Sequence, residues 1–327
     1  MITFWVSVLV LSILFYVLLD GFDLGVGILY GFARQDCARR AMMHAVAPVW
    51  DSNQTWLIVS GVTLWGAFPI VYATLFSAFY LPLIFMLAGL ILRGVAFEFR
   101  NKAHHLPWVW DVGFSGGSLV AAFMQGTMVG ALAQGLPLLN GNYAGNAFSW
   151  MNPLTTLCGA GLCLGYALLG ACWLVRKSEG EVQAASFRLI PVLLLCTLVV
   201  LAVLFSVALD EHLRVLTRWL ERPYLFAIPL VGLVAGIALA LSVLRRRERE
   251  PLYLVGTIFF VAFGMLVVSF WPYIIPFSVT VDEAAAPRSS LAFMFWGEGL
   301  FLLPLMLLYT TISYRVFRGK VSPSSDY

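Results

Sequence analysis

Long apolar runs dominate this chain and decide what it can fold into. A helix needs about 20 apolar residues to cross a bilayer, and nine runs approach or exceed that length. They lie at residues 3–31, 52–68, 71–98, 110–135, 153–175, 187–209, 224–244, 252–276 and 291–316. The second run is short and is followed by a tight turn at Phe68-Pro69. The sequence therefore predicts an all-α polytopic membrane protein with nine transmembrane helices.

Composition points to the same class of protein. The chain is 61% hydrophobic and 11% charged, whereas an ordinary soluble domain carries about 25% charged residues. Connections between the runs are short, so we expect a single membrane domain over residues 1–327. The first run lacks the basic start and the A-x-A cleavage pattern of a signal peptide and is too long for one, so we interpret it as a span. The sequence shows no basic stripe with interleaved aromatic residues, which argues against a nucleic-acid partner.

The distribution of Lys and Arg predicts the orientation, because cytoplasmic connections of membrane proteins are enriched in these residues. With nine spans, fifteen of the twenty Lys and Arg residues fall on one side. The other side holds Arg214, Arg218, Arg222 and Arg288, and Arg93 lies within a span. We therefore expect the N-terminus outside and the C-terminus in the cytoplasm.

Two carboxylates interrupt the first apolar run. Asp20 and Asp23 stand in LLDGFDLGVG, three residues apart, and so share one face of a helix. Ionisable groups at mid-span cost about 2.5–3.5 kcal/mol each on insertion scales and usually face protein or a water path. Gly21 and Gly25 form a small-xxx-small pair that lets a second helix approach closely. The pattern fits a proton relay or, alternatively, a carboxylate pair that hydrogen-bonds to neighbouring helices for packing specificity.

A polar cluster opens the second run. In APVWDSNQTWLI, the residues from Asp51 to Gln54 are all polar and lie between Trp50 and Trp56. One interpretation is a capped helix start, and another is Trp50 as an interfacial anchor. Capping does not require four consecutive polar residues. On the predicted cytoplasmic side, the cluster would also suit the mouth of a proton path toward Asp20.

The third run contains two charged residues, Arg93 and Glu98. A spacing of five residues does not place them on one helix face. Arg93 either extends its side chain toward the cytoplasmic interface or pairs with a carboxylate of another helix. We interpret both residues as structural on this pattern alone.

Histidine and cysteine positions argue against a haem or metal site in this chain. His44, His104, His105 and His212 fall in or beside predicted connections, and none lies well inside a span. Haem of the b type in a membrane protein needs axial ligands at membrane depth, usually His or Met. The five cysteines form no C-x-x-C pair. We therefore expect this chain to bind no haem or metal by itself.

Four motifs together resemble one family. LDGFDLGVGIL, APVWDSNQTWLI, FSAFYLPLIFMLAGLILRGVAFEFRNK and TVDEAAAPRSSLAFMF, the last followed later by YRVFRGK, are similar to subunit II of the cytochrome bd-type quinol oxidases. The resemblance runs from the first helix to the tail. The first two motifs are highly specific when they occur together.

This resemblance implies a fold and an activity. The nine helices would form two four-helix bundles plus one peripheral helix, and would pair with a haem-bearing subunit I. That partner carries b-type and d-type haem, oxidises membrane quinol and reduces O2 to water, and a small single-helix accessory subunit accompanies some complexes. Subunit II stabilises subunit I, supplies part of the cytoplasmic proton path and, in some members, holds a structural quinone. The location would be the bacterial cytoplasmic (inner) membrane.

The resemblance also implies roles for particular residues. The family's proton path maps onto Asp51 and then Asp20, and Asp23 matches the second acid of the G-F-D motif. In some members an oxygen route passes through subunit II close to the third span. The candidates for that route, or for a structural role, are Trp56, Arg93 and Glu98.

Two other functions stay open on the residues alone. A proton-coupled membrane transporter would also carry carboxylates at membrane depth, but it usually shows inverted repeats or broken helices, and neither is clear in this sequence. A purely structural subunit would stabilise its partner without conducting protons.

Overall fold

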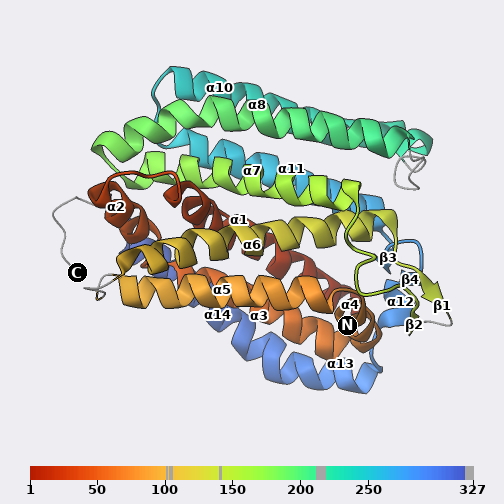
Figure 1. The fold of residues 1–327 in the computed structure, drawn as a ribbon. Coiled ribbons are helices and arrows are strands. Elements are labelled where there is room, and N and C mark those ends of the chain that lie inside the picture. The colour runs from red at the N-terminus through yellow and green to blue at the C-terminus, as the bar shows by residue number, and fades with distance from the viewer. Residues whose placement is uncertain (101, 103–105, 140–141, 211–218, 321–327) are drawn as a thin grey trace.

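A computed structural model gives the arrangement of residues 1–100, 102, 106–139, 142–210 and 219–320. The long helices run roughly side by side, and two small β-hairpins gather at one end of the molecule, where the chain also begins (Figure 1). The short helix α2 (Asp36–Val46) lies at the opposite end. Arg214 and Arg218, which the orientation prediction uses, lie outside the described residues.

The remaining elements follow in chain order. The helices are α1 (Ile2–Tyr30), α3 (Trp50–Ala67), α4 (Pro69–Ala78), α5 (Tyr80–Arg100), α6 (Pro107–Gln134), α7 (Pro153–Lys177), α8 (Gly180–Asp210), α10 (Ala227–Leu244), α11 (Glu250–Phe270), α12 (Val281–Ala284), α13 (Arg288–Met294) and α14 (Leu303–Val316). A 3₁₀ turn, Pro223–Phe226, precedes α10, and a π-helical segment, Phe295–Leu302, joins α13 to α14. The strands pair antiparallel, β1 (Leu138–Leu139) with β2 (Asn142–Tyr143) and β3 (Tyr273–Ile275) with β4 (Val279–Thr280).

The described helices confirm an all-α, multi-pass architecture. Eight of them are long and apolar enough to cross a membrane, and the pair α3 and α4 brings the number to nine if it is one span. These two helices are bent by 119° at the predicted turn after Phe68. Helix α3 packs beside α1, whereas α4 contacts β2 and α12 at the hairpin end (Figure 1). The grouping into two four-helix bundles plus a peripheral helix stays a prediction.

One predicted span begins too early. The run 71–98 is divided, because α4 ends at Ala78 and the crossing helix α5 begins only at Tyr80. Pro82 explains the division, since proline lacks the N–H that a continuous helix would donate to the carbonyl of Ala78. Within the first turn of α5, the same missing N–H costs nothing.

Another predicted span ends too late. The run 252–276 is helical only to Phe270, where α11 ends. Pro272 cannot continue the hydrogen-bond ladder of the helix, and the chain turns into the strand Tyr273–Ile275. Apolar content alone did not distinguish the membrane helix from the apolar hairpin that follows it.

Close packing of α1 against α7 confirms the predicted small-residue contact. A Cβ atom on Gly25 would lie 1.8 Å from the carbonyl oxygen of Tyr166, and one on Gly170 would lie 2.5 Å from the backbone of Gly25. A Cβ atom on Gly21 would meet the Tyr166 ring at 2.7 Å. The two helices can therefore touch backbone to backbone only because glycine stands at these positions.

Candidate functional site

Both acids of α1 are buried inside the helix bundle. The side chains of Asp20 and Asp23 are 0% and 1% exposed. Helix α1 packs against α3, α6 and α7, so the face that carries the two acids meets protein rather than lipid. This burial confirms the expectation drawn from the glycine pattern.

Asp20 forms an ion pair with Arg93 of α5. The Nη2 atom of Arg93 donates to Oδ1 of Asp20 at 2.6 Å, and both side chains are fully buried. The same Nη2 atom donates to Oε1 of Gln54 at 3.3 Å. Of the two roles considered for Arg93, the structure therefore supports pairing with a carboxylate of another helix.

Asp23 is held by the second polar helix, α3. The amide nitrogen of Asn53 donates to Oδ2 of Asp23 at 2.7 Å and to the carbonyl of Leu19 at 3.2 Å. The hydroxyl of Tyr314, on α14, donates to Oδ1 of Asn53 at 2.9 Å. Asp23 is thus connected through one amide to the last helix of the chain.

A third chain of hydrogen bonds reaches the acids from α7 and α6. The hydroxyl of Tyr166 donates to Oε1 of Gln125 at 2.9 Å, and Nε2 of Gln125 donates to the hydroxyl of Tyr16 at 2.8 Å. Tyr16 lies one helical turn before Asp20 on α1, within electrostatic reach of its carboxyl. Five helices, α3, α5, α6, α7 and α14, therefore contribute polar groups around one turn of α1.

Several atoms of the cluster have unused hydrogen-bonding capacity. Within the described part of the chain, Oδ2 of Asp20, Oδ1 of Asp23, and Nε and Nη1 of Arg93 have no hydrogen-bond partner. A buried acceptor without a donor is costly, by about 1–3 kcal/mol. The two carboxyl oxygens are thus the atoms at which this cluster would take a proton.

The other predicted site residues lie outside this cluster. Asp51 is exposed in the first turn of α3, one turn before Gln54. Trp56 is buried and packs on the ring of Phe15 at 4.8 Å between centroids. The side chain of Glu98 is 67% exposed and lies 3.7 Å from Lys102. The structure thus brings together Asp20, Asp23 and Arg93 but not Asp51, Trp56 or Glu98.

Sequence reasoning missed four participants: Tyr16, Gln125, Tyr166 and Tyr314. Gln125 carried a usable signal, because an amide inside an apolar run needs hydrogen-bond partners. Tyr16 and Tyr166 carried none, because tyrosine is common at both membrane interfaces and in protein cores. Tyr314 opens the YRVFRGK motif, but the motif did not indicate which residue it contacts.

A second charged cluster ties α2 to the bundle. Asp111, at the start of α6, accepts from Arg39 at 2.7 Å and from Arg100 at 3.0 Å, and it also accepts from Tyr30. Arg100 also pairs with Asp36 of α2, which holds the pKa of Asp36 below its ordinary value. Asp111 is therefore an ion-pair centre that joins α2 to α5 and α6.

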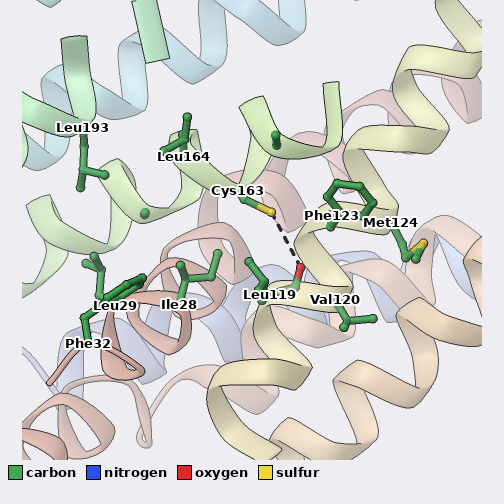
Figure 2. Close-up of a pocket in the computed structure, with 12 residues that line it drawn as sticks. Ile28, Leu29, Phe32, Leu119, Val120, Phe123, Met124, Cys163, Leu164 and Leu193 are labelled. Atoms are coloured by element: carbon green, nitrogen blue, oxygen red, sulfur yellow. Dashed lines mark hydrogen bonds between the residues drawn. The ribbon is translucent and has the colours of Figure 1, made fainter. Parts of the chain in front are cut away.

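An apolar pocket of about 600 Å³ opens between α1, α6, α7 and α8 (Figure 2). Among the residues that line it, Cys163 carries the one polar side-chain group, and its thiol donates to the carbonyl of Leu119 at 3.8 Å. A quinone ring would need hydrogen-bond donors for its carbonyl oxygens. The pocket therefore suits an apolar chain.

Metal-binding groups are not found in the described ranges. No three His, Cys, Asp or Glu side chains there are placed to share a metal ion. His44 lies in the last turn of α2, and His104, His105 and His212 lie outside the described residues.

Comparison with known proteins agrees with this architecture along the whole chain. Residues 1–317 match the family described as cytochrome bd terminal oxidase subunit II. Subunit 2 of the cytochrome bd-I ubiquinol oxidase of Escherichia coli (strain K12) is 32% identical, over 97% of this chain and 94% of the relative. Cytochrome bd ubiquinol oxidase subunit 2 of Bacillus subtilis (strain 168) is 29% identical, over 97% and 96%. A chain in the structure of bd oxidase from Geobacillus thermodenitrificans shares the fold, with a TM-score of 0.78 and 16% identity over 97% and 98%. This chain therefore belongs to the cytochrome bd terminal oxidase subunit II family.

Proposed function

We propose that this chain is the second subunit of a bd-type quinol oxidase and that its buried acids carry protons from the cytoplasm toward the haem site of subunit I. The relatives are subunits of cytochrome bd ubiquinol oxidases. Reduction of O2 to water consumes protons inside the membrane, so such a complex needs a protonatable path to its buried reaction site.

The charge balance around Asp20 carries this proposal. Arg93 supplies one positive charge and the two acids supply two negative charges, so the cluster is neutral when one carboxyl holds a proton. A net charge deep in a low-dielectric site is strongly disfavoured. Interacting carboxyls of this kind titrate as a unit. The cluster therefore suits the storage and transfer of one proton, with Asp20 and Asp23 as its two acceptors.

Asp51 supports the direction of transfer. It is exposed at the start of α3, and Gln54 one turn further along accepts from Arg93. A proton would be collected at Asp51 and passed along the polar turn of α3, with water between the groups, to Asp20 and Asp23. The α2 end of the bundle, rich in arginine, would face the cytoplasm under the positive-inside rule. The N-terminus would then lie outside the bacterial inner membrane.

One face of the last span favours a protein partner. Glu298, in the π-helical segment, is half-buried, and its carboxyl has no ion-pair or hydrogen-bond partner among the described residues. Phe301, three positions further along the helix, is exposed. A carboxyl at membrane depth is costly against lipid, and aromatic residues are enriched at protein interfaces. We therefore propose that Glu298 and Phe301, the Glu298 face, contact subunit I.

Trp56 and Arg93 would serve as a packing residue and a counter-ion, not as parts of an oxygen route. Arg93 is the counter-ion of the acids, and Trp56 packs α3 against α1 through Phe15. The b-type and d-type haem belong, on this proposal, to subunit I, as does the site that oxidises quinol. Stabilisation of subunit I would follow from the interface itself. No observation favours a proton-coupled transporter over this assignment.

Substitution of the acids in the assembled oxidase tests the proposal. Asp20→Asn and Asp23→Asn keep the shape of the side chain but remove the proton-accepting carboxyl. We expect oxidase turnover with quinol to fall by about 100-fold or more, the scale of lost acid–base groups, while the haem spectrum and subunit ratio are preserved. Asp282→Asn, the same change at an exposed acid of α12, serves as the control. Full turnover in both buried-acid variants would refute the proton-carrying role.

A further inference from the structure

We infer that Tyr314 is a positioning residue for this proton transfer, because its hydroxyl fixes the amide of Asn53 and thereby the N–H group that faces Asp23. The inference rests on the proposed proton-carrying role of Asp23. It extends that role to α14, where Tyr314 opens the YRVFRGK motif.

Both ends of the Asn53 amide are occupied by specific partners. Its oxygen accepts from Tyr314, and its nitrogen donates to Asp23 and to the carbonyl of Leu19. Asn53 is 0% exposed, so no bulk water replaces a partner that is lost. The hydrogen bonds therefore determine which end of the amide faces the acid.

Rotation of this amide by half a turn would change what Asp23 meets. The oxygen and nitrogen ends of an asparagine amide have nearly the same shape, so only hydrogen bonding distinguishes them. In the rotated orientation the amide oxygen would face both Asp23 and the carbonyl oxygen of Leu19. The Tyr314 hydroxyl opposes this rotation by donating to the oxygen on the far side of the amide.

Packing fixes the Tyr314 ring where this donation is possible. The ring meets Phe22 of α1 edge to face at 6.5 Å and Trp173 of α7 at 6.2 Å between centroids. Just beyond it, the ammonium group of Lys177 donates to the carbonyl oxygens of Phe317 and Gly319. These contacts hold the end of α14 across the end of α7 and keep the hydroxyl directed at Asn53.

Removal of the hydroxyl alone tests the inference in the two-subunit oxidase. Tyr314→Phe keeps the ring and its packing. We expect the kcat for quinol oxidation to fall by about 3- to 10-fold, the scale of one hydrogen bond, while the KM for quinol and the haem spectrum stay unchanged. Tyr309→Phe makes the same chemical change at an exposed tyrosine of the same helix, and it should leave kcat as in the unsubstituted complex.

A double substitution shows whether Tyr314 acts through Asn53. In an Asn53→Leu complex the amide is absent, so Tyr314→Phe should add no further decrease to the residual kcat. An equal decrease in both backgrounds, or a Tyr314→Phe complex with unchanged kcat, would overturn the inference. If the Tyr314→Phe complex does not assemble, 3-fluorotyrosine at position 314 keeps ring and hydroxyl but alters the strength of the donor. An unaltered kcat in that complex would overturn the inference as well.

Asp23→Asn distinguishes this inference from the proposed function. If Asp23→Asn slows turnover and Tyr314→Phe does not, the inference alone is wrong. If neither substitution slows turnover, the proton-carrying role of Asp23 fails together with it.

Discussion

Arg93 and Asp20 form an ion pair sealed from solvent, with Nη2 of the arginine 2.6 Å from Oδ1 of the acid and both side chains fully buried. The pair joins α5 to α1 at the depth where Asn53 and Tyr314 join α3 and α14 to the same turn. The acids thus hold the helices together and also form the proposed proton site. Substitutions must therefore be assayed for assembly and for turnover separately.

Loss of the arginine should destabilise the protein more than loss of both partners. Arg93→Gln leaves Asp20 buried without its cation, and breaking such a pair from one side costs about 3–5 kcal/mol. The double substitution Arg93→Gln with Asp20→Asn removes both charges and should recover part of this loss. The melting temperature of the purified complex measures the loss in Arg93→Gln and the recovery in the double variant. A double variant that unfolds earlier than Arg93→Gln would contradict the account.

The contact between α1 and α7 should not tolerate a methyl group. Gly25→Ala would place its Cβ 1.8 Å from the Tyr166 carbonyl oxygen, so the helices must move apart, and overpacking of this kind costs about 1–3 kcal/mol. Gly264→Ala on α11 is the control, because a Cβ atom there meets nothing within 4 Å. We expect a lower melting temperature and yield for Gly25→Ala only. Equal melting temperatures in the two variants would argue against backbone contact at this point.

Acid should weaken the attachment of α2. Arg100 and Arg40 hold the pKa of Asp36 below its ordinary value of 3.8, so the acid stabilises the fold above that value and loses this contribution as the pH falls through the folded pKa. The side chain is 53% exposed, and solvent screening limits the contribution to about 0.2–1 kcal/mol. Asp36→Asn should therefore lower the melting temperature slightly at neutral pH. The difference in melting temperature between Asp36→Asn and the unsubstituted protein should shrink as the pH is taken below 3.8. A difference that grows at lower pH would contradict a stabilising role of the ionised Asp36.

The Glu298 face should lie against subunit I in the assembled complex. A photo-crosslinking amino acid at Phe301 should capture subunit I on illumination of native membranes. Leu195, on the exposed and aliphatic face of α8, is the control and should capture lipid only. Capture of subunit I from position 195 but not from 301 would place the interface elsewhere.

The sequence predicted the features that carry a large free-energy cost, such as charges inside a span, and did not predict which side chains meet across helices. Two acids in an apolar run had to be buried against protein, and glycine at the spacing of Gly21 and Gly25 indicated close packing, so both features could be predicted. Arg93 could be placed in a span, but its partner could not, because the sequence does not say which helices are neighbours. The same ambiguity hid Tyr314, which is 261 residues away from Asn53 along the chain. The spacing of five residues between Arg93 and Glu98 predicted different helix faces, and Glu98 is exposed near the end of α5.

Proton uptake during a single turnover shows directly whether the buried acids of this subunit carry protons. The fully reduced complex is mixed with O2 in weakly buffered solution containing a pH-sensitive dye, and uptake is timed against the haem absorbance. In Asp20→Asn, we predict unchanged oxygen binding but proton uptake slowed by about 100-fold or more, as expected for loss of an acid–base group. Uptake at the rate of the unsubstituted complex, in an assembled Asp20→Asn variant, would contradict a proton path through the buried acids of this subunit.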